Sequence, residues 1–429
     1  MNKDQKPVGF IKRTVGKIKN KIGKIYSDYD EKRARKDIIF TEPITKKEEP
    51  PVHYELVKSG IDIQFLIIVI ALLAFGAMMC FSASYYYASN KFGDSFYYFK
   101  HYLFFAVVSI GGSALFVIFA TPRFWKVFSM AVYGVSIILL AMVLVIGVEG
   151  GGAQRWIQIG PLTLQPSEIA KMAVIMMLSL YMAHYEKEIR STHVFGGSVR
   201  HGVLFPGLII GAIIVLVMLE KHISGVMIIG IIGIAVMYLA GTRGEWLCVI
   251  IGTVALAGCL LILVSDYAQE RVMTWLFIEQ ADPQGSAWQT LQGLYAIGSG
   301  GVFGLGLGNS RQKYGYVSEP QNDFIFTIVC EELGFVGALL ILTLFGLLIW
   351  RGFKIASRAA DKFSQLVAYG LTIKLALQVI LNIAVVTNTL PSTGISLPFF
   401  SYGGTSLIIL LAEMGVVMSV SRMSQIEKT

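Results

Sequence analysis

Long apolar stretches alternate with short polar segments along most of the chain, and their length sets the fold class. A helix that crosses a bilayer needs about 20 mostly apolar residues, at a rise of about 1.5 Å each. We therefore expect an all-α polytopic membrane protein with ten spans and a large loop between the seventh and the eighth. The predicted spans cover residues 63–83, 100–120, 124–147, 169–185, 203–219, 225–241, 247–264, 324–350, 365–388 and 406–422.

Composition supports a membrane protein. The chain has 429 residues, of which 55% are hydrophobic and 15% charged, and its mean hydropathy of +0.64 excludes an ordinary soluble domain. We divide it into a basic extension, 1–60, a ten-span domain, 61–422, and a short tail, 423–429. Lys and Arg concentrate in 1–60, 187–200 and 351–362, all on the terminal side of a ten-span chain. Both termini are therefore expected in the cytoplasm.

The N-terminal extension carries an amphipathic pattern. Its apolar residues recur every three or four positions between lysines, at Ile11, Val15, Ile18, Ile22 and Ile25. Such a basic helix either lies on the anionic inner leaflet or is a solvated tail that reinforces topology. Residues 41–52 are typical of a linker, and the first span would act as an uncleaved anchor.

The familiar cofactor and metal motifs are missing from the sequence. The four cysteines fall within or at the ends of spans without paired spacing, and the histidines form no two-ligand motif, so we predict neither a disulfide nor a structural metal. The glycine run 298–308 matches neither the dinucleotide-binding nor the P-loop pattern. It predicts either a re-entrant or interfacial segment that lines a cavity, or close helix packing through small residues.

Asp323 stands at the start of the eighth span, on the face opposite the termini. Its carboxylate would either cap the first free N–H groups of the helix or act as a general base for a hydroxyl nucleophile. Glu319 is the second carboxylate of this segment, either a helper of Asp323 or a rim residue.

Two further polar sets face the same side. The first holds the candidate binding residues Arg155, Gln165, Ser167, Glu168 and Lys171. Glu168 and Lys171 share one helix face, which indicates an interfacial ion pair, or a phosphate site if Arg155 and Lys171 receive the anion. The second set surrounds the glycine run, and its mixture of cations and amides suits a sugar diphosphate. Its members are Arg271, Gln289, Gln292, Gln312 and Lys313.

Four ionisable residues fall inside the last three spans: Glu331, Glu332, Lys374 and Glu413. Such groups are costly in a bilayer unless they are paired or face a wet cavity. A buried ion pair of Lys374 with Glu332 or Glu413 is the simpler interpretation, and the sequence does not choose between the two partners.

Several motifs, in one order along the chain, resemble the SEDS family (shape, elongation, division and sporulation), whose members include FtsW, RodA and SpoVE. The resemblance covers about residues 60–422. Its segments are Ala153-Gln-Arg-Trp, Gln165-Pro-Ser-Glu-Ile-Ala-Lys, Ala296-Ile-Gly-Ser-Gly-Gly, Gly306-Leu-Gly-Asn-Ser, Asn322-Asp-Phe-Ile-Phe, Glu331-Glu-Leu-Gly and Leu397-Pro-Phe-Phe-Ser-Tyr-Gly-Gly-Thr-Ser. The last segment adds Ser401 and Tyr402 to the candidate binding residues.

The resemblance implies a peptidoglycan glycosyltransferase in the bacterial cytoplasmic membrane, with Asp323 at the position of the family's essential aspartate. The substrates would be lipid II and a lipid-linked glycan strand, and undecaprenyl diphosphate would leave. No cofactor is required, although a divalent cation such as Mg²⁺ or Mn²⁺ would assist the diphosphate. Implied partners are a class B penicillin-binding protein, other division or sporulation proteins and membrane lipids, with no nucleic acid.

The chain also departs from the family pattern. Glu220-Lys-His-Ile-Ser stands where many members have Gln-Pro-Asp, and Gln321-Asn322 replace a usual His and Thr. The run from Asn388 to Phe400 is closer to FtsW and SpoVE, which favours division or sporulation over elongation. Two other functions stay open: a lipid II transporter, which would depend on ionisable residues within the spans, and a scaffold that recruits the penicillin-binding protein.

Overall fold

The computed structural model describes residues 54–58, 60–119, 122–150, 153–160, 162–191, 197–282, 285 and 287–427. Contacts divide the chain into two compact units, 56–426 and 1–55 with 427–429, and the first contains all the helices of the described residues. The predicted amphipathic helix and linker lie outside the described residues.

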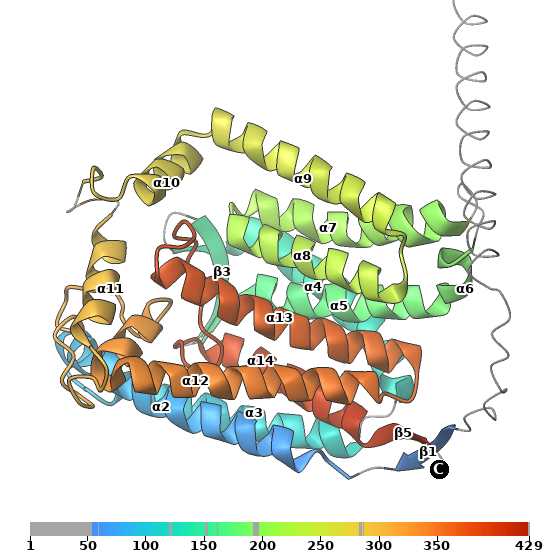
Figure 1. The fold of residues 1–429 in the computed structure, drawn as a ribbon, viewed down its shortest axis with the longest axis horizontal. Helices are drawn as coiled ribbons and strands as arrows, with labels where there is room; N and C mark the ends of the chain where they lie inside the picture. The colour runs from blue at the N-terminus through green and yellow to red at the C-terminus, as the bar shows by residue number, and fades with distance from the viewer. Residues whose placement is uncertain are drawn as a thin grey trace, which may run out of the picture. The chain divides into compact units, whose positions relative to one another are not determined.

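Helices dominate the described chain, as predicted (Figure 1). They are α2 (Ile63–Phe92), α3 (Tyr97–Phe119), α4 (Pro122–Ile146), α5 (Pro166–His184), α6 (Glu186–Ile189), a π-helical turn η2 (Arg200–Leu204), α7 (Phe205–Leu219), α8 (Ile223–Ala240), α9 (Gly244–Val264), α10 (Asp266–Leu276), α11 (Trp288–Ser299), α12 (Ile325–Ser357), α13 (Lys362–Val386) and α14 (Gly404–Ser421).

Strands are few and short in the described chain. A three-stranded antiparallel sheet, in the order β2-β3-β4, is built from Val148–Gly150, Ala153–Ile159 and Leu162–Leu164. A second sheet pairs β1 (Tyr54–Lys58) with β5 (Met423–Glu427). The three-stranded sheet ends at Leu164, directly before α5 begins at Pro166.

The predicted spans correspond to the long helices. Nine helices within the described residues are long and apolar enough to cross a bilayer, and α9 contributes a shorter apolar stretch, Gly244–Leu260. The prediction of an all-α polytopic membrane protein is therefore confirmed. The predicted spans 203–219 and 225–241 form a tight hairpin around Glu220, because α7 ends at Leu219, α8 begins at Ile223, and the two helices pack together.

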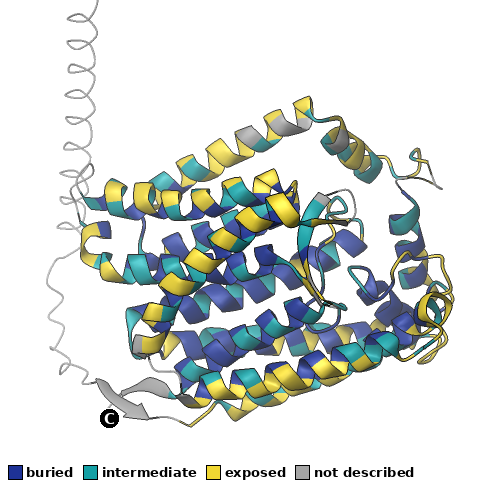
Figure 2. Ribbon diagram, turned by 180° about the vertical axis from the view of Figure 1, so that it is seen from behind, coloured by how far each residue is buried: buried dark blue, intermediate teal, exposed yellow. Residues whose placement is uncertain are grey.

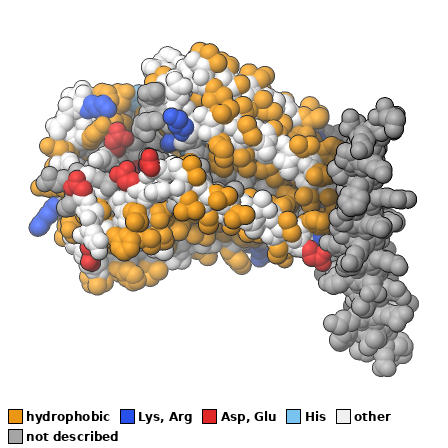
Figure 3. Space-filling model, turned by 90° about the horizontal axis from the view of Figure 1, so that it is seen from above, with side chains coloured by type: hydrophobic (Ala, Val, Ile, Leu, Met, Phe, Trp, Pro, Cys, Tyr) orange, Lys and Arg blue, Asp and Glu red, His pale blue; other side chains and the backbone are white. Residues whose placement is uncertain are grey.

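The interior of the bundle is formed by α5, α13 and α14. Figure 2 shows these helices largely buried, whereas α9 and the outer faces of α7 are exposed. Hydrophobic side chains cover the exposed sides of the bundle, as expected for helices that face lipid (Figure 3). Most charged side chains visible in that view gather at the end of the bundle that carries α10 and α11, here called the α11 end.

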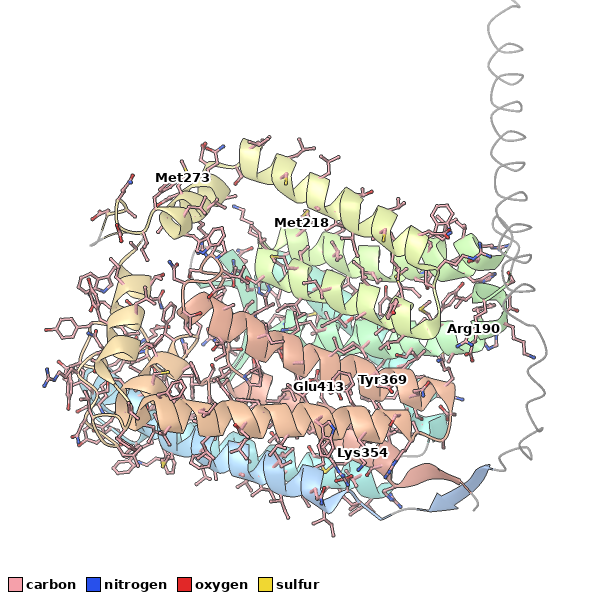
Figure 4. The ribbon with its side chains drawn as sticks, viewed as in Figure 1. Arg190, Met218, Met273, Lys354, Tyr369 and Glu413 are labelled. Carbon is pink, nitrogen blue, oxygen red and sulfur yellow. The ribbon has the colours of Figure 1, made fainter. Side chains whose placement is uncertain are left out.

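Labelled side chains mark the two ends (Figure 4). Arg190, which follows α6, and Lys354 of α12 lie toward one end, here called the Arg190 end, and Met273 of α10 lies at the α11 end. Glu413 of α14 lies inside the bundle between them. The loops that follow α2, α4, α7 and α13 all reach the α11 end (Figure 1).

Helix α12 is kinked near its start, and the glycine run fills the kink. Gly334 has φ +68°, which breaks the helix and frees backbone groups on both sides. Leu305 N–H donates to Glu331 O at 2.9 Å, and Phe335 N–H donates to Gly301 O at 2.9 Å. The run 298–308 therefore packs backbone to backbone against α12, which is the close-packing alternative. It lines neither of the two cavities described below.

Candidate active site

A polar cavity of about 260 Å³ opens among the ends of α5, α8, α13 and α14 and the loops between them. Its size approaches the lower limit of roughly 300 Å³ for small-molecule sites. The polar side chains that line it are Arg155, Gln165, Glu168, Lys171, His222, Ser224, Asn322, Asp323, Lys374, Gln378, Ser401 and Tyr402. Asp323, four of the five residues of the set that begins with Arg155, and the pair Ser401 and Tyr402 thus meet in one place.

The sheet and the start of α5 supply one wall. Arg155 and Trp156 lie on β3, and Gln165 is the N-cap residue of α5, followed by Pro166 in the first turn. Proline suits that position because its missing N–H would have no partner there. Arg155 donates from its Nη2 to Lys221 O at 2.8 Å, which ties the sheet to the turn between α7 and α8.

Four charged side chains form a buried network behind this wall. Lys171 Nζ lies 2.5 Å from Glu168 Oε1, and Glu168 Oε2 lies 3.8 Å from Lys374 Nζ. Lys374 Nζ lies 2.5 Å from Glu413 Oε1. Pairing offsets much of the cost of burying such charges. The predicted pair of Glu168 and Lys171 is confirmed but is buried rather than interfacial, and Glu413 is the partner of Lys374.

Asp323 is held at the rim of the cavity by a buried amide. Asn382 of α13 donates to Asp323 O at 2.8 Å and to Ile395 O at 2.7 Å. Because Asn382 is fully buried, it fixes the segment before α12 against the loop before α14. The carboxylate points toward that loop, since a Cβ built on Gly394 would lie 3.6 Å from Asp323 Oδ2.

Ser401 and Tyr402 strengthen the same junction. Ser401 Oγ donates to Asn322 O at 2.8 Å, and Tyr402 N–H donates to Gln321 O at 2.8 Å. Both residues therefore align the segment that carries Asp323, besides lining the cavity. Two loops far apart in the sequence are thus joined by hydrogen bonds at the two residues that precede Asp323.

The surroundings of Asp323 raise the pKa of its carboxyl group, which makes the carboxylate a better proton acceptor. Burial raises the pKa of its carboxyl group to about 6, and the charge of Glu319 adds to the rise. Neighbouring backbone N–H groups and Arg271 oppose the shift. The capping role is wrong, because Phe324 is the N-cap residue of α12 and no side chain makes the cap hydrogen bond there.

The remaining predicted residues lie outside the cavity lining. Ser167 is buried in the first turn of α5. Lys313 donates from Nζ to Glu332 Oε1 at 2.9 Å and to Gly308 O at 2.7 Å, and Gln312 N–H donates to Glu331 Oε2 at 3.4 Å. Here Glu331 and Glu332 anchor the loop before α12, so Lys313 serves as the counter-ion of Glu332.

Four more predicted residues occupy α10, α11 and the segment before α12. Arg271 of α10 donates to Ser392 O, and Gln289 of α11 donates to Ser318 O at 3.4 Å. Gln292 is buried in α11. Glu319 accepts a hydrogen bond at 2.8 Å from Nδ2 of Asn322, the residue that precedes Asp323. The structure thus gathers seven of the fourteen predicted residues at the cavity and places the others around it.

Several lining residues were not predicted as site residues. Gln378 lies one turn after Lys374 on α13, and this four-residue spacing was a readable signal. His222 and Ser224 belong to the departure from the family pattern, where no such signal existed. Burial, helped by the charges of Lys171 and Arg155, lowers the pKa of His222 to about 4, so its imidazole is neutral near neutral pH.

The described residues contain no cluster of metal-ligating side chains. No group of three or more His, Cys, Asp or Glu side chains is arranged there to hold a metal ion.

The fold and the cavity define a polytopic helical membrane protein with a charged site at one end of its bundle. A family model described as cell cycle protein, for FtsW, RodA and SpoVE, matches residues 63–426. The chain belongs to this family, and the predicted family resemblance is confirmed.

Individual relatives agree. The chain is 40% identical over 372 residues to stage V sporulation protein E of Bacillus subtilis (strain 168), covering 86% of this chain and 99% of the relative. It is 37% identical over 366 residues to the probable peptidoglycan glycosyltransferase FtsW of Coxiella burnetii, covering 84% and 96%.

Solved structures share the fold. A chain of a peptidoglycan synthase complex, which coordinates polymerization and crosslinking, superposes with a TM-score of 0.67 at 28% identity, covering 84% of this chain and 98% of that one. The rod shape determining protein RodA of Thermus thermophilus gives a TM-score of 0.60 at 28% identity, covering 84% and 97%.

Proposed function

We propose that this chain is a peptidoglycan glycosyltransferase that polymerises lipid II, with Asp323 as the general base. The observation that carries the proposal is a carboxylate with a raised pKa, held at the rim of a cavity lined by three cationic side chains. A base of this kind works best when its pKa lies near the working pH. Membership of a family whose relatives are named as glycosyltransferases supports the same reaction.

The reaction would proceed by a single displacement. Asp323 takes the proton from the 4-hydroxyl of the GlcNAc of lipid II as its oxygen attacks the anomeric carbon of the MurNAc at the lipid-linked end of the strand. A new C–O bond forms, the bond to the diphosphate oxygen breaks, and the anomeric centre is inverted. The charge on the departing undecaprenyl diphosphate would be received by Arg155 and Lys171.

A divalent cation is a second component of the proposal. Mg²⁺ or Mn²⁺ bound by the diphosphate would neutralise the leaving group, and Asp323 and Glu168 are the two carboxylates of the lining that could contact it. Chelation with EDTA would lower the rate if this cation is required, and added Mg²⁺ would restore it.

The ionisable residues within the spans favour the enzyme over the transporter. Glu332 is paired with Lys313, Lys374 is paired with Glu413, and Glu331 accepts a hydrogen bond from Arg311 N–H at 2.9 Å. These three carboxylates and Lys374 all have partners within the fold, which fits a structural role, whereas a transporter would depend on ionisable groups within its spans that change partners during its cycle.

The orientation and partners complete the proposal. The α11 end, with Asp323, would face outward, and the Arg190 end would face the cytoplasm of a bacterial cell, because Lys and Arg concentrate in 187–200 and 351–362. By the same rule, both termini would be cytoplasmic. A class B penicillin-binding protein is the proposed partner, since a solved relative belongs to a complex that couples polymerization to crosslinking. The growth process would be division or sporulation.

The decisive experiment is polymerisation of labelled lipid II by purified protein with a co-expressed class B penicillin-binding protein. We expect the native chain to form glycan strands and Asp323→Asn to lose at least about 100-fold in rate, as is typical for removal of a general base. Complex yield and thermal stability are matched first. Equal activity of the two proteins would refute Asp323 as the general base. Movement of lipid II across the membrane of vesicles, without strand formation, would support the transporter instead.

A further inference from the structure

A second cavity lies beside the polar cavity at the α11 end. It has a volume of about 440 Å³ and lies between the last turns of α2 and the segment 313–320 that precedes α12. Three tyrosines, Tyr86, Tyr87 and Tyr314, line it, and we call it the tyrosine cleft. Its volume falls within the range of roughly 300–1,000 Å³ that is usual for small-molecule sites.

The tyrosines are arranged as a wall that stays accessible. The rings of Tyr86 and Tyr314 meet edge to face, with centroids 4.9 Å apart. Lys91 lies over the Tyr87 ring at 5.2 Å and donates to the Tyr87 hydroxyl at 3.2 Å. Tyr314 remains 51% exposed, so one of its faces meets solvent. Flat rings and polar groups thus alternate along the same surface.

Two chains of contacts connect this wall to the polar cavity. Glu319 accepts a hydrogen bond from the Tyr87 hydroxyl at 3.3 Å and another from Asn322 Nδ2 at 2.8 Å, and Asn322 lines the polar cavity. The Tyr87 ring also contacts that of Tyr98, with centroids 6.1 Å apart, and Tyr98 stacks edge to face on Tyr402 at 4.6 Å. The tyrosine cleft and the cavity that holds Asp323 are therefore linked by direct side-chain contacts.

We propose that the tyrosine cleft is a glycan-binding subsite, which holds sugar rings one or more units away from the ring that reacts at Asp323. This inference rests on the proposed function. A pyranose ring has apolar C–H faces and hydroxyl edges, and a tyrosine matches both, with a flat ring and a polar tip. The side chains of Asn90 and Lys91 supply further hydrogen-bond donors in the lining.

The chemistry of the lining distinguishes a saccharide from a lipid tail. A polyprenyl chain is best accommodated by an uninterrupted apolar wall, whereas this wall carries hydroxyl, amide and ammonium groups. A bound strand would place several sugar units on the protein at once, so that release after each addition becomes slow. The subsite would thus make polymerisation processive.

The test uses the full-length protein and lipid-free GlcNAc–MurNAc oligosaccharides, with binding measured by calorimetry. Tyr314→Ala should weaken binding by about fivefold, the loss expected for one aromatic contact, and Tyr314→Phe should retain most of it. Tyr316→Ala is the matched control, because Tyr316 lies in the same loop with the same 51% exposure but does not line the cleft. Equal binding by Tyr314→Ala and Tyr316→Ala would overturn the proposal.

A second readout is the length of the glycan strands. Tyr314→Ala should shorten them and Tyr316→Ala should not. If Tyr314→Ala instead loses a co-purified penicillin-binding protein while oligosaccharide binding is unchanged, the cleft is a docking surface and the proposal fails. Binding needs no turnover, so failure of the Asp323→Asn experiment leaves this test valid. Normal oligosaccharide binding by Tyr314→Ala would refute the glycan-binding subsite but not the proposed glycosyltransferase function.

Discussion

Asp323 shows how one carboxylate is given its properties by neighbours from distant parts of the chain. Its backbone is fixed by Asn382, and Ser401 fixes the residue before it. The sequence identified Asp323 and Ser401 but not Asn382, because an amide inside an apolar span resembles many structural asparagines. Its role follows only from the fold, which brings α13 beside the start of α12.

The raised pKa of Asp323 predicts the pH dependence of polymerisation. The base must be ionised, so the rate should fall about tenfold per pH unit below about pH 6. The folded-state pKa exceeds the ordinary value of 3.8, so this group's stabilising contribution is fully present below that value and is lost as pH rises through about 6. Loss of activity in acid would therefore not come from unfolding caused by this residue.

Strand formation and thermal stability measured in parallel over about pH 5 to 8 would check this prediction. A rate that stays flat across that interval, with the protein folded throughout, would show that Asp323 is not the titrating base.

At the scale of elements, the glycine run and the kinked α12 are one packing unit. A Cβ on Gly300 would lie 1.9 Å from Cys330 O, a backbone atom that cannot rotate away. Gly300→Ala should therefore lower stability by about 1–3 kcal/mol. Gly298 is the matched control, since a Cβ there meets nothing within 4 Å.

Thermal unfolding of the two variants in detergent gives the comparison. We expect Gly298→Ala to be neutral or slightly stabilising, because alanine is the better helix former in α11. If both variants unfold at the same temperature as the unchanged protein, the glycine run 298–308 does not pack tightly against α12.

Hydropathy predicted the spans but not all their limits. Helix α2 was expected to end at residue 83 but continues to Phe92. Its last turns are rich in tyrosine and polar residues, so the apolar pattern did not reveal that they are helical. The three-stranded sheet was not predicted, since its strands have only three to seven residues. The partner of Lys374 depends on which helices touch, which no local pattern encodes.

At the scale of the molecule, the orientation in the bilayer decides which substrates reach Asp323. In a background without the native cysteines, Tyr316→Cys at the α11 end should react with an impermeant maleimide on intact cells. Arg190→Cys should react only after the membrane is opened. These expectations follow from the concentration of Lys and Arg at the Arg190 end.

Labelling followed by gel shift is a direct readout, and activity of each variant confirms that it is folded. The reverse pattern of labelling would place the candidate active site in the cytoplasm and would contradict the proposed use of lipid II on the outer face.

The buried network of two lysines and two glutamates has an electrical consequence. Moving one elementary charge through a membrane potential of 100 mV involves about 2.3 kcal/mol. Because Glu168, Lys171, Lys374 and Glu413 are joined by ion pairs and sum to zero charge, a rigid displacement of the network does no net work in that field. The membrane potential therefore does no work on such a movement of this network, which fits the proposal that the diphosphate donor supplies the energy for each bond.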